Sequence, residues 1–258
     1  MEARLGFAGP GLAHPGLAHP IFDPVRRWLE RLPRAGWPTH EALSALAAEA
    51  QLRTESGCAV RFVPPAPHDA YYEVLVHRTG QVQTRPGNWH DLFNALAWLA
   101  FPRTKARLNA LHAAELPREG GRRGRRRDML TIFDEGGAIV VCADPALEAL
   151  VREFRWRELF WARRSALAAG LRVLVLGHAV LEQALEPRPG ITCKAVFAPP
   201  GSDPDRAAMH ALGSHASPRT LAPFPVFGMP GWDPRNGAEA FYRDERYFRP
   251  LRRDAAVR

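Results

Sequence analysis

The chain has 258 residues, of which 46% are hydrophobic and 24% charged, as expected of a globular protein with a substantial core in one large or two small domains. No run of about 18 apolar residues occurs, so we expect no membrane-spanning helix. Three widely spaced cysteines and the lack of a signal-peptide pattern predict a soluble, cytoplasmic protein without a disulfide framework.

The net charge of +8 is only a weak indication of an anionic partner. Just two of the 35 basic residues, Lys105 and Lys194, are lysines, and the arginines are accompanied by abundant alanine, glycine and proline. This is the amino-acid bias of a GC-rich genome. The charge therefore permits binding to phosphates or anionic surfaces without requiring it.

The two ends of the chain differ in composition from its middle. The pentapeptide GLAHP occurs at 11–15 and again at 16–20, and its proline and glycine predict a flexible N-terminal arm over residues 1–20. Residues 21–216 are predicted to form a single globular domain. Residues 217–258, rich in proline and aromatic side chains, are expected to pack on it as an extended tail. The sequence does not indicate the oligomeric state.

Periodicity and capping residues predict the regular elements in chain order. Helices are expected at 23–32, 39–52, 88–101, 103–116, 145–154, 157–169, after residue 177 and at 203–215. Strands are expected at 59–63, 71–77, 81–85, 129–133, 138–143, 172–177 and 191–197, including hairpins of 71–77 with 81–85 and of 129–133 with 138–143. The predicted class is α+β, with a parallel βαβ unit near residues 172–197 as one option.

The helix expected at 88–101, NWHDLFNALAWLAF, is apolar nearly all round beyond its first turn, as buried helices are. Yet His90 and Asn94 lie one turn apart on one side of it. After Pro102, the next helix carries Lys105, Asn109 and His112 on a shared face. If the two faces converge across Pro102, they form a candidate catalytic or binding cluster. The alternative is that these residues are caps and satisfied core groups that fix the helix–helix angle.

The chemistry of this cluster favours an anionic small ligand. Imidazoles transfer protons near neutral pH, a lysine holds a phosphate or carboxylate, and asparagines fix a substrate or stabilise negative charge. A zinc site based on His90 and His112 would need a third ligand, such as His178 or Asp128. Because no recognised metal, phosphate-loop or nucleophile motif occurs, no metal or cofactor is assigned, and the sequence does not decide whether the protein is an enzyme.

Asp128 and His178 are weaker site candidates. Asp128 follows a run of arginines and enters an expected strand, from which it could reach the helix pair. His178 ends an apolar strand, where α/β sites are often built. Asp134 is expected to cap the turn DEGG instead, because six residues of strand would place it about 20 Å from Asp128.

The arginines in GRRGRRR (121–127) support a second hypothesis, a nucleic-acid or anionic-partner binding module that contacts phosphates. No aromatic residue is interleaved among them, which argues against base stacking. A solvated surface loop is favoured, and nucleic acid is not the preferred partner. A third hypothesis is a scaffold protein without a pocket.

Two blocks of sequence carry a family resemblance. WHDLFNALAWLAFPRTKARLNALHAAEL (89–116) and RRGRRRDMLTIFDEGGAIVV (122–141) resemble the bacterial domain-of-unknown-function family thirty twenty-five. The resemblance covers most of the chain after the N-terminal arm. It implies no established activity, and therefore no catalytic residues.

Overall fold

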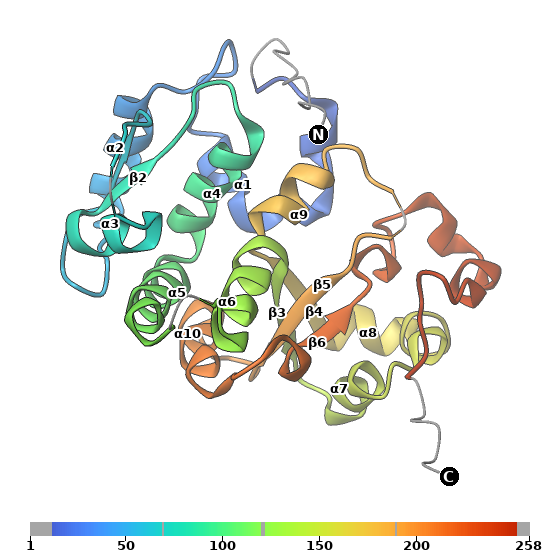
Figure 1. Cartoon of the computed structure of the whole chain (residues 1–258). Coiled ribbons are helices and arrows are strands. Elements are labelled where there is room, and N and C mark those ends of the chain that lie inside the picture. The colour runs from blue at the N-terminus through green and yellow to red at the C-terminus, as the bar shows by residue number, and fades with distance from the viewer. Residues whose placement is uncertain (1–11, 69, 120–121, 189, 252–258) are drawn as a thin grey trace.

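Strand β3 (Gly137–Cys142) is the centre of the fold in this computed structural model, which describes residues 12–68, 70–119, 122–188 and 190–251. It pairs antiparallel with β4 (Leu171–Val175) and parallel with β5 (Cys193–Ala198). β6 (Ala222–Phe224) adds an antiparallel edge strand to β5. The order of this mixed sheet is β4-β3-β5-β6 (Figure 1).

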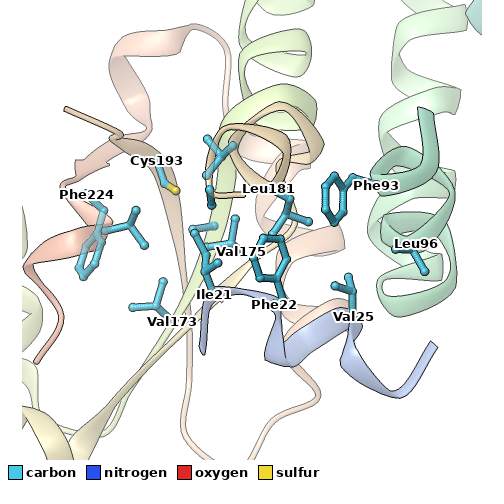
Figure 2. Close-up of a cluster of buried hydrophobic side chains, with 14 of the residues drawn as sticks. Ile21, Phe22, Val25, Phe93, Leu96, Val173, Val175, Leu181, Cys193 and Phe224 are labelled. Carbon is cyan, nitrogen blue, oxygen red and sulfur yellow. The ribbon is translucent and has the colours of Figure 1, made fainter. Parts of the chain in front are cut away.

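Every residue of β3 is buried because helices cover both of its faces. Ala138 and Val140 face a core shared with the N-terminal helices and the C-terminal aromatic residues. Ile139 and Val141 face a second core built by α5, α6 and α10. Figure 2 shows part of the first core, in which Phe22 lies between the sheet and α4.

Helices enclose the sheet and the small second sheet of parallel strands β1 (Arg61–Val63) and β2 (Gln81–Gln83). The helices are α1 (Asp23–Leu29), α2 (His40–Glu49), α3 (Tyr72–Thr79), α4 (Trp89–Ala100), α5 (Pro102–Glu115), α6 (Arg125–Gly136), α7 (Pro145–Arg152), α8 (Arg164–Gly170), α9 (His178–Gln183) and α10 (Pro204–Ser214). A π-helix covers Glu158–Ala162. No helix in the described ranges is long and apolar enough to cross a membrane.

The predicted α+β class is confirmed, as are the helix starts that carry a capping signal. Asn88 accepts a hydrogen bond from the Asp91 amide at the start of α4, and Pro102 is the first residue of α5. The helices predicted at 39–52 and 203–215 are confirmed as α2 and α10.

Two predicted strands, 71–77 and 129–133, are helices instead, so neither predicted hairpin forms. Short apolar runs with β-branched residues fit both structures, and burial decides between them. In α6, Met129, Leu130 and Phe133 are buried while Ile132 is exposed, which is helical spacing. The α3 helix ends at Gly80, whose positive φ of 71° favours glycine.

The parallel βαβ unit considered near residues 172–197 is also wrong. β4 and β5 do not pair with each other, because β3 lies between them. Since β3 is antiparallel to β4 and parallel to β5, the two strands run in opposite directions. α9 therefore connects two strands on either side of the central one.

The described residues near the two ends of the chain form short regular elements. Residues 1–11 and 252–258 lie outside the described residues. In the tandem pentapeptide, His14 and His19 accept hydrogen bonds from the Gly16 and Ile21 amides and so cap two short 3-10 turns. Near the other end, residues 217–251 supply β6 and several 3-10 turns.

Candidate functional site

A cavity of about 370 Å³ opens between α3, α4, α5, α6 and α9. It collects all five residues of the predicted cluster together with His178. Asp128 is not among the residues that line it. The lining residues are Pro65, Tyr72, Glu73, Val76, Gln83, Arg85, His90, Asp91, Asn94, Trp98, Lys105, Leu108, Asn109, His112, Thr131, Asp134, Glu135 and His178.

Lys105 links three helices at the wall of this cavity. Its side chain is only 4% exposed, and its Nζ atom donates hydrogen bonds to Asn94 Oδ1 at 2.8 Å and to Asp134 Oδ1 at 2.5 Å. Burial alone would raise the pKa of Asp134, but the Lys105 ammonium holds that pKa below its ordinary value. The Asp134 carboxyl is therefore ionised at neutral pH.

Asp134 does not cap a turn, contrary to the prediction from sequence. It lies in the last two turns of α6, one residue before Glu135. Both side chains line the cavity, whereas Asp128, one and a half turns earlier, forms an ion pair with Arg123 at 2.9 Å. The helical geometry of α6 thus separates the two aspartates that an extended strand would have placed on one face.

Asn109 and His112 lie on α5 with Lys105 and are also buried. Asn109 Nδ2 donates to the Glu73 carbonyl oxygen at 2.8 Å. Asn109 Oδ1 and His112 Nδ1 are buried without a hydrogen-bond partner among the described residues. Burial lowers the pKa of His112, so its imidazole is neutral at pH 7. Each such unpartnered buried polar atom costs the fold roughly 1–3 kcal/mol.

At the α9 end of the cavity, two imidazoles and a carboxylate meet. His178 Nε2 lies 3.1 Å from His90 Nε2 and 3.4 Å from Glu135 Oε2. The distance from His90 Nε2 to the same Glu135 oxygen is 3.8 Å. Among the described residues, these three form a group whose ligand atoms lie close enough together to hold a metal ion.

The protonation of this group follows from burial. His178 is almost fully enclosed, and burial lowers its pKa to about 3. Burial also raises the pKa of the Glu135 carboxyl, and the negative charge of the nearby Asp134 carboxylate raises it further. The second ring nitrogen of His90, Nδ1, lies 3.1 Å from Glu182 Oε2.

A glycine contact positions Glu135 and His178. Gly177 packs so closely on the end of α6 that a Cβ atom on it would lie 2.5 Å from Gly136 Cα and 2.6 Å from Gly137 N. The Gly177 amide donates to the Gly137 carbonyl oxygen at 2.9 Å. This contact brings together the residues next to it, Glu135 at the end of α6 and His178 at the start of α9.

No arginine of the segment 122–127 lines the cavity, and most of the segment's charge is already paired. Ion pairs join Arg126 to Glu115 at 3.6 Å and Arg127 to Glu119 at 2.7 Å. With the Arg123 pair, three of the five arginines of 122–127 contact carboxylates. Their charge is therefore largely compensated within the fold.

Sequence reasoning missed several residues of the cavity. Tyr72 and Glu73 were assigned to a strand, yet α3 brings them to the wall, where Asn94 Nδ2 lies 3.5 Å from the Tyr72 hydroxyl. Glu135 was read as part of a turn. The adjacent carboxylates of Asp134 and Glu135, before two glycines, are a sequence signal for site residues. The signal places them at the cavity only if the segment is known to be a helix.

The fold and the cavity define an α+β protein with a polar cavity bounded by helices. Residues 60–252 match the family described as "Protein of unknown function (DUF3025)", and the chain belongs to this family. No curated protein and no solved structure matched the chain.

Proposed function

We propose that the cavity is the binding site of a small polar molecule, and that His90, Asn94, Lys105, Asn109, His112 and His178 contact it. The observation that carries the proposal is that these six polar residues, from three helices, line one cavity, and that three of them, Asn109, His112 and His178, each hold a buried polar atom without a partner among the described residues. A stable protein satisfies most such atoms. A polar ligand in the cavity would hydrogen-bond to the polar side chains that line it.

The buried Lys105–Asp134 pair supports the same proposal. The desolvation cost of burying an ion pair often exceeds the gain from the attraction between the two charges, so such pairs are weak contributors to stability. Here one partner faces the cavity with 26% of its side chain exposed. A charge held rigidly at a cavity wall orients a polar ligand, which gives the pair a role in binding.

The lining charges limit the kind of ligand. Four lining carboxylates stand against the cations Lys105 and Arg85, and Arg85 already binds Asp91 at 2.8 Å. An anionic group on the ligand therefore needs a further positive charge in the cavity. Catalysis of proton transfer by the imidazoles is part of this proposal, as is a cytoplasmic location, which fits three free cysteines.

The proposal is tested by thermal unfolding of the full chain with inorganic phosphate, a hexose phosphate, a dicarboxylate and an amino acid, each with and without added Zn²⁺. A bound ligand raises the midpoint, by the equivalent of about 2.7 kcal/mol at a hundred times its Kd. Asn94→Leu should abolish the rise, and Gln183→Ala, an exposed control on α9, should keep it. If no compound raises the midpoint of the wild-type chain, or if Asn94→Leu responds like wild type, the proposal is wrong.

The nucleic-acid alternative makes the opposite prediction. Only Arg122 and Arg125 of the segment have no carboxylate partner among the described residues. If the segment binds a polyanion, replacing these two by alanine reduces retention on a heparin column and flattens its dependence on salt. We expect unchanged retention.

A further inference from the structure

His90, Glu135 and His178 come from three different helices, α4, α6 and α9, and place three possible ligand atoms within 3.8 Å of one another. We propose that they bind one divalent transition-metal ion in the cavity. This inference goes beyond the proposed function, because such an ion would bind whether or not a small molecule occupies the rest of the cavity.

The distances among the three atoms fit a metal ion. The triangle of His90 Nε2, His178 Nε2 and Glu135 Oε2 has sides of 3.1, 3.4 and 3.8 Å. The point equidistant from its corners lies about 2.0 Å from each, and metal–nitrogen and metal–carboxylate bonds are about 2.0–2.2 Å long. An ion just outside the plane of these three atoms would lie within bonding distance of each after side-chain movements of about a tenth of an ångström.

The surroundings of His90 match those of a metal-ligating histidine. Such a histidine usually gives its other ring nitrogen to a carboxylate or carbonyl, which fixes the tautomer and the orientation of the ring. His90 Nδ1 has this partner in Glu182 Oε2 at 3.1 Å. When Nδ1 carries the proton, Nε2 presents its lone pair to the point shared with His178 and Glu135.

A metal-free account explains less of this arrangement. The two imidazoles, with their Nε2 atoms 3.1 Å apart, can share one hydrogen bond, but that bond does not account for the Glu135 carboxylate placed within 4 Å of both rings. The four carboxylates of the lining also exceed its two cations. A dication would offset this excess where Glu135 lies.

The donor set indicates the class of ion and its use. Two imidazoles with one carboxylate suit Zn²⁺, Fe²⁺, Mn²⁺ or Co²⁺ better than Ca²⁺ or Mg²⁺, which prefer oxygen ligands. Three protein ligands leave at least one coordination position open, as in catalytic rather than structural sites. Because His90 and Glu135 line the cavity together with Lys105 and Asn94, an open position there would receive an anionic group of the ligand.

The test is metal binding by the full chain after removal of ions with a chelator. Titration calorimetry with Zn²⁺, and the visible absorption of added Co²⁺, should show one ion per chain. Glu135→Gln and His90→Ala remove ligands on partly exposed side chains, and we expect each to lower affinity at least 100-fold. Glu182→Gln should lower it about 10–100-fold, and His210→Ala, an exposed histidine outside the site, should leave it unchanged.

Two results would overturn the proposal. One is a wild-type chain that takes up no Zn²⁺ or Co²⁺. The other is a Glu135→Gln variant that is folded by circular dichroism and binds with wild-type affinity. Neither measurement contains an organic ligand, so failure here leaves the small-molecule proposal to its own unfolding experiment.

Discussion

The backbone of Gly177 rests on that of Gly136, and this contact holds His178 beside Glu135. A Cβ atom on Gly177 would lie 2.5 Å from Gly136 Cα, a separation that only a backbone shift can relieve. The contact joins the end of α6 to the start of α9. The need for glycine at position 177 therefore helps to set the positions of Glu135 and His178 at the cavity.

Gly177→Ala is therefore expected to destabilise the fold by roughly 1–3 kcal/mol, as overpacking against an immobile neighbour does. Gly136→Ala is the matched control, because a Cβ atom there meets only Val180 Cγ2 at an ordinary 3.7 Å. That variant should be neutral or gain about 0.5–1 kcal/mol from the helical preference for alanine. Urea unfolding measures both, and equal midpoints for the two variants would contradict the role given to this contact.

Removing both members of the Lys105–Asp134 pair should cost less than the sum of the two single losses. Lys105→Met leaves the Asp134 carboxylate without its cation, with an expected loss of roughly 2–4 kcal/mol, somewhat below the range for fully buried pairs because Asp134 is partly exposed. The double variant Lys105→Met/Asp134→Leu should recover at least about 1 kcal/mol of the summed losses.

A surface pair provides the comparison for this cycle. Arg107 and Glu55 lie 3.2 Å apart with about a third of each side chain exposed. Arg107→Ala is expected to change the free energy of unfolding by less than about 1 kcal/mol. If the loss in the Lys105→Met/Asp134→Leu variant equalled the sum of the two single losses, the two charges would not interact as their distance implies.

The sequence was most informative where local chemistry decides structure. Asn88 caps the start of α4, and Pro102 separates α4 from α5. Both effects act within a few residues, so the ends of the two helices are predicted closely from the sequence. Helical spacing then placed His90 with Asn94, and Lys105 with Asn109 and His112. Their convergence on one cavity follows from the break between the two helices.

What sequence could not supply was the long-range part of the site. MLTIF, at 129–133, is too short for periodicity to separate a buried strand from a helix, and this error removed Asp134 and Glu135 from consideration. His90 and His178 are 88 positions apart. Their contact depends on how α9 packs on α4, which no local pattern encodes.

Asp233 should make stability depend on pH at acid values. Its carboxylate, 4% exposed, accepts hydrogen bonds from the Arg235 side chain and amide, and the Arg235 side chain lowers its pKa below the ordinary value. A depressed folded-state pKa gives stability that is present above the unfolded pKa of about 3.9. That stability is lost as pH falls through the folded pKa.

Asp233→Ala is therefore expected to cost about 0.5–2 kcal/mol at pH 7, as loss of an N-cap does. The difference from wild type should shrink as pH falls below about 4. Urea unfolding of both proteins between pH 3 and pH 7 measures the effect. A difference that stays constant over this range would mean that the charge of Asp233 is irrelevant to the cap.

Tyr247 bonds the C-terminal region to the segment that precedes β5 through a buried hydroxyl. This hydroxyl donates to the Ile191 carbonyl oxygen at 2.8 Å and accepts from the Phe227 amide at 2.9 Å. Tyr247→Phe preserves the ring packing but leaves both backbone groups unpaired, with an expected loss of roughly 1–3 kcal/mol. Tyr71→Phe is the control, because that ring is 67% exposed and should change stability by less than about 0.5 kcal/mol. Chemical denaturation distinguishes the two, and a Tyr247→Phe midpoint matching that of Tyr71→Phe would show that the hydroxyl does not hold the C-terminal segment in place.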